Sequence, residues 1–199
     1  MRITKYTHSC VRLEHDSGGV LVIDPGVWSE PRALRGADAV LVTHEHGDHI
    51  DSLRLAGLGA PVYAPVGADI PGLETVVLEP GAEFSVAGFR VKALGGRHAG
   101  IYGGKPACPN LGYLVDGSVY HPGDSLHLPG QPVETLFVPM QASWLKTSEA
   151  IDFVRSVAAE QAIGIHDAQL NERGLSSTNA WLTEEAGTNY RWLAPGSHV

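Results

Sequence analysis

One segment of the chain joins a short apolar strand to a dense run of metal-binding side chains. Residues 39–43 (Ala-Val-Leu-Val-Thr) are typical of a strand buried on both faces, and they lead directly into His44-Glu45-His46-Gly47-Asp48-His49. Imidazoles and carboxylates at the end of a buried strand need a charge partner to be tolerated away from water. The segment therefore restricts the chain to folds that gather polar groups around this strand end, and it predicts metal binding there.

The spacing inside this segment predicts two binding positions. His44 and His46 are two residues apart, so in an extended chain their side chains point the same way and can bind one ion such as zinc. Asp48 and His49 follow Gly47, where the chain must turn into a helix. They would therefore aim differently from the first pair and could serve a second ion close by.

Further candidate ligands follow other predicted strands. His98 and Asp124 come after predicted strands and His166 ends one, and open sheets usually build their sites from groups gathered at strand ends. A single histidine at a strand end is usually a surface residue. These three are candidates because the segment 44–49 already predicts a site that needs partners.

Length, charge and composition limit the class of protein. A chain of 199 residues suits one domain, 1–199, and a net charge of −8 without a Lys/Arg stripe predicts neither nucleic-acid nor membrane binding. No apolar run approaches the roughly 18 residues of a membrane span, and the N-terminus lacks the apolar core of an export signal. We expect a cytoplasmic protein with a small-molecule substrate and two reduced cysteines, Cys10 and Cys108. Its oligomeric state stays open.

Hydrophobic periodicity predicts hairpin-rich strands first and strands alternating with helices later. This order is typical of two packed sheets with helices on their outer faces, an α/β (α+β) fold. Thr147 is the expected N-cap of the second helix. The expected strands are 2–7, 10–15, 20–24, 39–43, 62–64, 75–78, 83–86, 89–94, 111–116, 118–121, 134–139, 162–166 and 189–193, and the expected helices are 51–58, 147–161 and 177–186.

These residues resemble the pattern of the metallo-β-lactamase fold superfamily. The resemblance begins at Asp24-Pro25-Gly26, continues through Thr43 to His49, and includes His98, Gly123-Asp124 and His166 in the expected order. It implies a four-layer αββα sandwich with two metal ions at one edge, between the sheets.

The resemblance also implies a role for each residue. His44, His46 and His98 would hold the first ion, and Asp48, His49 and His166 would hold the second. Asp124 would bridge the two ions, and Asp24 would brace the ligand loop by hydrogen bonds. Three imidazoles at the first position favour Zn²⁺, while carboxylates near the second also permit Mn²⁺ or iron.

A finer resemblance is to short bacterial members akin to the ascorbate-6-phosphate lactonase group, through Tyr6-Thr7-His8-Ser9-Cys10 and residues 138–146. The implied function is a binuclear metal-dependent hydrolase whose metal-bound hydroxide attacks a small ester, lactone or phosphodiester. Asp48 is the expected catalytic residue for proton transfer, or else a plain ligand. Alternatives are iron-dependent oxidation of a sulfur compound and a metal-stabilised binding protein without turnover.

Residues around the site are open to two interpretations. Trp144 would form a substrate wall or else pack in the core, and Lys146 would contact an anionic substrate or else be a solvated lysine at a helix start. His8 and Cys108 are expected to be structural, although Cys108 follows the His98 loop and could approach the pocket.

Overall fold

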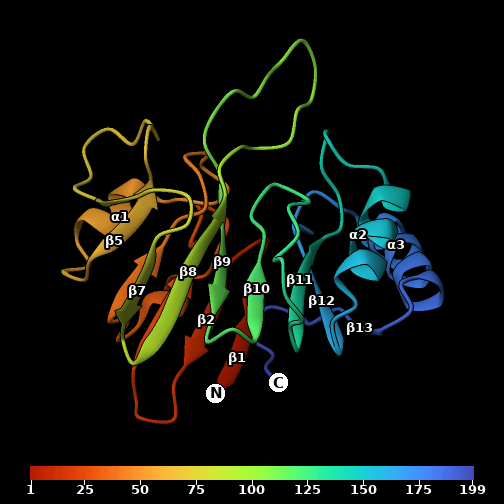
Figure 1. Cartoon of the computed structure of the whole chain (residues 1–199), viewed down its shortest axis with the longest axis horizontal. Helices are drawn as coiled ribbons and strands as arrows, with labels where there is room; N and C mark the ends of the chain where they lie inside the picture. Colours follow the sequence, from red (N-terminus) through yellow and green to blue (C-terminus); the bar gives the residue numbers. More distant parts are fainter.

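Two β-sheets packed face to face form the centre of the structure, a computed structural model that describes all 199 residues (Figure 1). The first sheet has the order β1-β2-β3-β4-β5-β6, in which the β1-β2-β3 pairs are antiparallel and the later pairs parallel. Its strands are β1 (Arg2–Lys5), β2 (Val11–Glu14), β3 (Val20–Ile23), β4 (Ala39–Leu41), β5 (Val62–Pro65) and β6 (Val76–Leu78).

The second sheet repeats this change from hairpins to parallel crossovers. Its order is β13-β12-β11-β10-β9-β8-β7, with antiparallel pairs from β7 to β10 and parallel pairs from β10 to β13. Its strands are β7 (Glu83–Val86), β8 (Phe89–Gly95), β9 (Leu111–Val115), β10 (Val119–His121), β11 (Thr135–Pro139), β12 (Gln161–Ile165) and β13 (Asn189–Arg191).

Alternating side chains build the layers, because successive residues of a strand face opposite sides of its sheet. In β3, Leu21 and Ile23 join the core cluster between the two sheets, while Val22 belongs to a separate cluster on the outer face. In β4, Leu41 and Val40 divide in the same way. The outer cluster of this sheet is closed by a 3₁₀ turn (Pro31–Leu34) and α1 (Ser52–Ala56).

Two amphipathic helices cover the outer face of the second sheet. The helices are α2 (Thr147–Val157) and α3 (Glu172–Glu185), and the apolar side of α2 packs Ile151 and Val154 with Leu136 and Val138 of β11. Helix, sheet, sheet and helix thus follow one another, which confirms the αββα architecture. None of the helices combines the length and apolar character that crossing a membrane requires.

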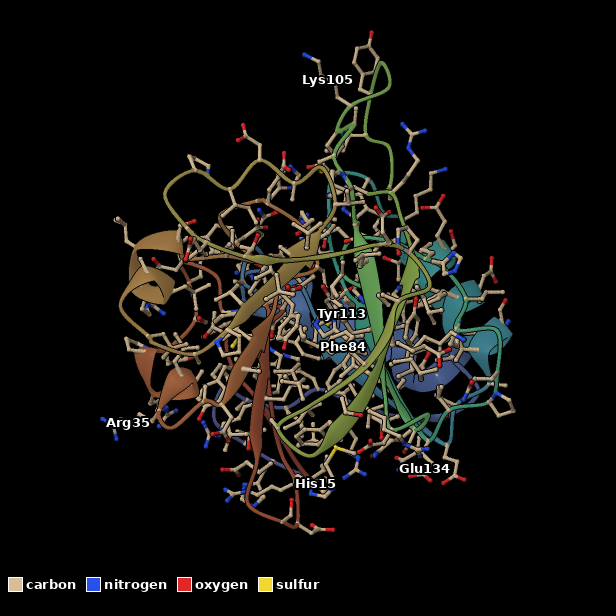
Figure 2. The ribbon with its side chains drawn as sticks, turned by 60° about the vertical axis from the view of Figure 1, so that its left-hand side comes forward. His15, Arg35, Phe84, Lys105, Tyr113 and Glu134 are labelled. Atoms are coloured by element: carbon tan, nitrogen blue, oxygen red, sulfur yellow. The ribbon has the colours of Figure 1, made fainter.

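Strand direction brings the carboxyl ends of most strands of both sheets to one edge of the sandwich. The antiparallel pairings make β1 parallel to β3 and β4 in one sheet, and β8 parallel to β10 and β12 in the other. The two sheets are joined there by the Leu111 amide, which donates to the Thr43 carbonyl, and by the buried Tyr113 hydroxyl, which donates to the Val42 carbonyl at 2.8 Å. The loop between β8 and β9, with Lys105, projects beyond this edge (Figures 1 and 2).

Two expected helix boundaries and one expected N-cap were wrong. Helix α2 ends at Val157 because Ala158 takes a left-handed conformation (φ 53°) that no helix continues through. Helix α3 begins at Glu172, five residues earlier than expected, since the Asn171 side chain caps it by accepting from the Gly174 amide. The N-cap of α2 is Lys146 rather than Thr147.

Candidate metal centre

The candidate ligands lie just beyond the strand ends that meet at the common edge. Their side chains are buried except for those of His46 and Asp48, which are half-buried. The residues and the strands they follow are His44 and its neighbours (β4), His98 (β8), Asp124 (β10) and His166 (β12).

The first group consists of His44, His46 and His98. One ring nitrogen of each lies within 4.8 Å of the others, and His44 Nε2 is 3.1 Å from His46 Nδ1. The convergence expected from the two-residue spacing is therefore present, and the third histidine comes from the other sheet.

A second group lies beside the first, and Asp124 stands between them. Ligand atoms of His8, Asp48, His49 and His166 lie within 4.8 Å of one another. Asp124 Oδ1 is 3.1 Å from His49 Nε2, while its Oδ2 is 3.2 Å from the Nε2 atoms of both His98 and His166. One carboxylate therefore contacts histidines of both groups.

Hydrogen bonds behind the site fix which nitrogen of His44 and His49 carries the proton. Asp24 is fully buried and accepts from the Thr43 amide and hydroxyl at 2.7 Å each, and from His49 Nδ1 at 2.6 Å. Because the Thr43 hydroxyl donates to Asp24, it accepts from His44 Nδ1 at 3.0 Å. Nδ1 therefore carries a proton in both rings, which leaves Nε2, facing the site, as the nitrogen that can bind a metal.

Backbone carbonyls orient two further rings in the same way. His98 Nδ1 donates to the Ala99 carbonyl at 2.6 Å, and His166 Nδ1 donates to the Gln141 carbonyl at 2.5 Å. Their Nε2 lone pairs therefore face the Asp124 carboxylate, so hydrogen-bond acceptors lie on both sides with no proton between them. Such an arrangement calls for a positive charge between them.

Unsatisfied buried atoms test whether a cation fits this centre. His49 Nε2, His166 Nε2 and Asp124 Oδ1 are buried and have no hydrogen-bond partner. A buried polar atom without a partner costs about 1–3 kcal/mol, so three at one point require an explanation. A metal ion bound by these atoms satisfies all three, and nitrogen with carboxylate oxygen is a donor set that zinc accepts.

The pKa values of the histidines and of Asp124 also favour a cation at this centre. Burial lowers the pKa of His44 well below its usual value, with His49 adding to the effect, so this ring is neutral. Burial would raise the pKa of Asp124, but His49 and His166 hold it well below its usual range. Burial opposes charge on His49 as well, yet the carboxylates of Asp124 and Asp24 raise its pKa well above the usual value. Positive charge is thus favoured between these groups.

Comparison with known proteins identifies the family. The chain matches the family described as the beta-lactamase superfamily domain over residues 2–166. It belongs to this superfamily. Protein Rv0786c of Mycobacterium tuberculosis is 36% identical over 211 residues, covering 100% of this chain and 99% of the relative. The UPF0173 metal-dependent hydrolase MK1542 of Methanopyrus kandleri is 30% identical, covering 83% of this chain and 84% of the relative.

Solved structures share the superfamily fold across the whole chain. Igni18, a metallo hydrolase from Ignicoccus hospitalis, matches with a TM-score of 0.76 at 17% identity, covering 100% of this chain and 97% of that one. CmlA, a diiron beta-hydroxylase from Streptomyces venezuelae, matches with a TM-score of 0.78 at 15% identity over 53% of its own chain. Likeness at these identities establishes the metallo-β-lactamase fold, as the sequence predicted, and nothing finer.

A cavity of about 130 Å³ opens at the centre and includes one of the two predicted pocket residues. Trp144 lines it and donates its indole N–H to Asp124 Oδ2 at 3.1 Å, so it does not pack in the core. Lys146 lies on the surface with its side chain 82% exposed, and it does not reach the cavity. The lining residues are His46, Asp48, His98, Ile101, Asp124, Ala142, Ser143, Trp144, His166 and Gln169.

His8 is the residue at the centre that sequence reasoning missed. It was expected to be structural, yet it lies in the second group with Nε2 3.2 Å from Asp48 Oδ2. A lone histidine after a short N-terminal strand carries no spacing signal. The direction of β1, parallel to β3 and β4, is the feature that could have placed it at this edge.

Asp24→Asn is expected to weaken the fold around the centre. Asparagine tolerates the left-handed backbone of Asp24 (φ 52°), but it removes the charge that Thr43 and His49 donate to. The free energy of unfolding should fall by about 1–3 kcal/mol, measured by urea denaturation. The exposed Asp152→Asn in α2 serves as control and should change little; equal stability of the two variants would contradict the bracing role of Asp24.

The two free cysteines should differ in reactivity. Cys108 is half-buried, with Sγ 3.8 Å from His46 Nε2, and burial raises the pKa of its thiol to about 11, with Glu45 adding to the effect. Cys10 is fully buried and the pKa of its thiol is raised further by burial. In folded protein at pH 8, iodoacetamide should modify Cys108 slowly and Cys10 not at all, as read by mass spectrometry. Modification of Cys10 at the rate of Cys108 would contradict this burial.

Proposed function

We propose that the chain is a metal-dependent hydrolase that holds two divalent ions. His44, His46 and His98 would bind the first ion, and Asp48, His49 and His166 the second, with Asp124 shared between them. The observation that carries the proposal is the convergence of His49 Nε2, His166 Nε2 and Asp124 Oδ1, three buried atoms that the protein leaves without a partner. The imidazole-rich first position supports Zn²⁺, and the carboxylates at the second also admit Mn²⁺ or iron.

The bound ions would supply Lewis acidity and bring the pKa of a water molecule from 15.7 toward about 7. The protein contributes orientation and proton transfer. Asp48 lines the cavity, and only its Oδ2 is held by a protein hydrogen bond, from His8. A carboxylate placed in this way can accept the proton of the attacking water, which is the catalytic role we propose for Asp48.

Trp144 forms part of the cavity wall beside the shared carboxylate of Asp124. Its indole N–H donates to Asp124 Oδ2, which fixes both the ring and the carboxylate. The ring also lies edge-on to His98 and His166, with centroids 6.1 and 6.4 Å away. We propose that it forms an apolar surface against which a substrate binds.

A small substrate with an ester, lactone or phosphodiester bond fits this site best. The cavity of about 130 Å³ suits a small molecule, and a net charge of −8 disfavours a long nucleic acid. Among the relatives, the protein of Methanopyrus kandleri carries the name metal-dependent hydrolase, which supports hydrolysis as the reaction class.

The test is a screen of zinc-loaded protein against small esters, lactones and phosphodiesters. Asp48→Asn should lower kcat/KM on any substrate found by about 10²–10⁴-fold, as for the loss of a general base. His15→Gln is the control, because His15 lies in the β2–β3 turn at the far end of the molecule (Figure 2), and it should keep full activity. No turnover of any substrate class by metal-loaded protein would contradict the proposal.

A further inference from the structure

His8 is held in a fixed position beside the second group of ligands. It follows β1, is fully buried, and has a left-handed backbone (φ 66°) that is uncommon for a non-glycine residue. Its ring packs on that of His166 with centroids 4.0 Å apart, and its carbonyl accepts from the His166 amide. An unfavourable backbone persists only where its surroundings dictate it, so His8 is kept at this place by the packing of the edge.

Two hydrogen bonds determine the protonation of the His8 ring. Nδ1 lies 3.3 Å from the Ala168 amide, which can only donate, so Nδ1 is the acceptor. A neutral imidazole carries a single proton, which must then be on Nε2. Nε2 therefore donates to Asp48 Oδ2 at 3.2 Å.

We infer that His8 is a positioning residue that donates from Nε2 to Asp48 Oδ2. It thereby holds the Asp48 carboxylate beside the other ligands of the second ion, with Oδ2 3.7 Å from His166 Nε2 and 4.0 Å from His49 Nε2. This inference rests on the proposed two-metal function. No other protein donor contacts the Asp48 carboxylate, so without His8 its orientation would be free. A partner of a ligating carboxylate is the kind of contact that raises metal affinity without touching the metal.

The same geometry argues against His8 as a ligand itself. A ligating Nε2 would have to be unprotonated, which would place the proton on Nδ1, facing the Ala168 N–H. Two donors would then meet at 3.3 Å.

A buried ion pair keeps the Ala168 amide in place. Asp167, the residue before it, accepts from Lys5 Nζ at 2.7 Å and from Trp192 Nε1 at 2.6 Å. Lys5 and Asp167 are both buried, and Lys5 ends β1, the strand that leads to His8. The ion pair thus ties the segment after β12, which carries the donor to His8 Nδ1, to the end of β1.

Two substitutions separate hydrogen bonding from structural support. The amide nitrogen of glutamine reaches the position of Nε2, whereas that of asparagine reaches only the position of Nδ1. His8→Gln should therefore preserve the donor to Asp48, and His8→Asn should remove it. The left-handed backbone favours asparagine over glutamine, so a purely structural role predicts the opposite order.

The readouts are metal affinity by competition with a chromophoric zinc chelator, the visible absorption of Co²⁺-loaded protein, and the melting temperature. In His8→Asn the Kd of the second ion should rise about 10–100-fold and its Co²⁺ bands should shift, with the first ion unchanged. His8→Gln should bind both ions as wild type does. Equal affinities in wild type and His8→Asn, with two ions bound, would overturn this inference alone. Wild type that binds no second ion would overturn the proposed function and this inference with it.

Discussion

Asp124→Ala is expected to abolish tight binding of both metal ions and, with it, hydrolysis. The Asp124 carboxylate contacts His49 through one oxygen and both His98 and His166 through the other, so its removal affects both groups at once. Loss of an outer partner of a metal ligand costs about 10–100-fold in affinity, and loss of a shared ligand should exceed that at each position. Elemental analysis of dialysed protein and kcat/KM measure the two effects.

A matched control distinguishes this effect from a general loss of acidic charge. Asp152→Ala removes an exposed carboxylate from α2, outside the cavity, and should keep the wild-type metal content. Circular dichroism of Asp124→Ala should still show the folded sheets, since the three hydrophobic clusters are untouched. An Asp124→Ala protein that is folded and retains two ions per chain would refute the shared role of this carboxylate.

Asp167→Leu is expected to destabilise the folded protein by about 3–5 kcal/mol, because it leaves the buried Lys5 ammonium without its partner. Lys5 Nζ lies 2.7 Å from Asp167 Oδ2, its side chain is 0% exposed, and burial lowers its pKa despite the adjacent carboxylate. Urea denaturation followed by tryptophan fluorescence measures the change, because Trp192 donates to the same carboxylate.

The double variant Lys5→Met/Asp167→Leu provides the control. Replacing both members of a buried pair with apolar residues of similar volume is often neutral or stabilising, so most of the lost stability should return. Additive losses in the two single variants, without recovery in the double variant, would show that the two charges do not interact in the folded protein.

The sheets and the centre of the site could be predicted from the sequence because their signals are local. Residues 39–42 are apolar throughout because this strand is buried on both faces, with Leu41 and Val40 in different core clusters. The two-residue spacing of His44 and His46 is enough to make their rings converge. The strands that precede Asp124 and His166 predicted that both lie at the sheet edge. The superfamily pattern then assigned both residues to the same site as residues 44–49.

What could not be predicted depends on contacts between distant segments. His8 is 40 residues from Asp48 and 160 residues from Ala168 along the chain, so neither hydrogen bond leaves a pattern in the sequence. The Trp144 indole reaches Asp124 only because both loops extend beyond the same edge. Helix α2 is terminated by Ala158 in a left-handed conformation. Glycine is the usual residue at such a position, so the alanine gave no sequence signal for the helix end.

A metal-dependent hydrolase differs from the two alternative proteins in the metal that it holds and in what its turnover requires. A binding protein without turnover would keep its metal and show no reaction for Asp48→Asn to impair. An oxidative enzyme would hold iron and consume an oxidant. Hydrolysis requires only water and a metal ion that stays in one oxidation state.

The decisive measurement is the metal content per chain, determined by elemental analysis on untagged protein never exposed to chelator. We predict about two zinc or manganese ions in wild type and a clear fall in His46→Ala, which removes the ring whose Nδ1 lies 3.1 Å from His44 Nε2. Predominant iron would favour the oxidative alternative. Wild-type protein without tightly held metal would contradict the account.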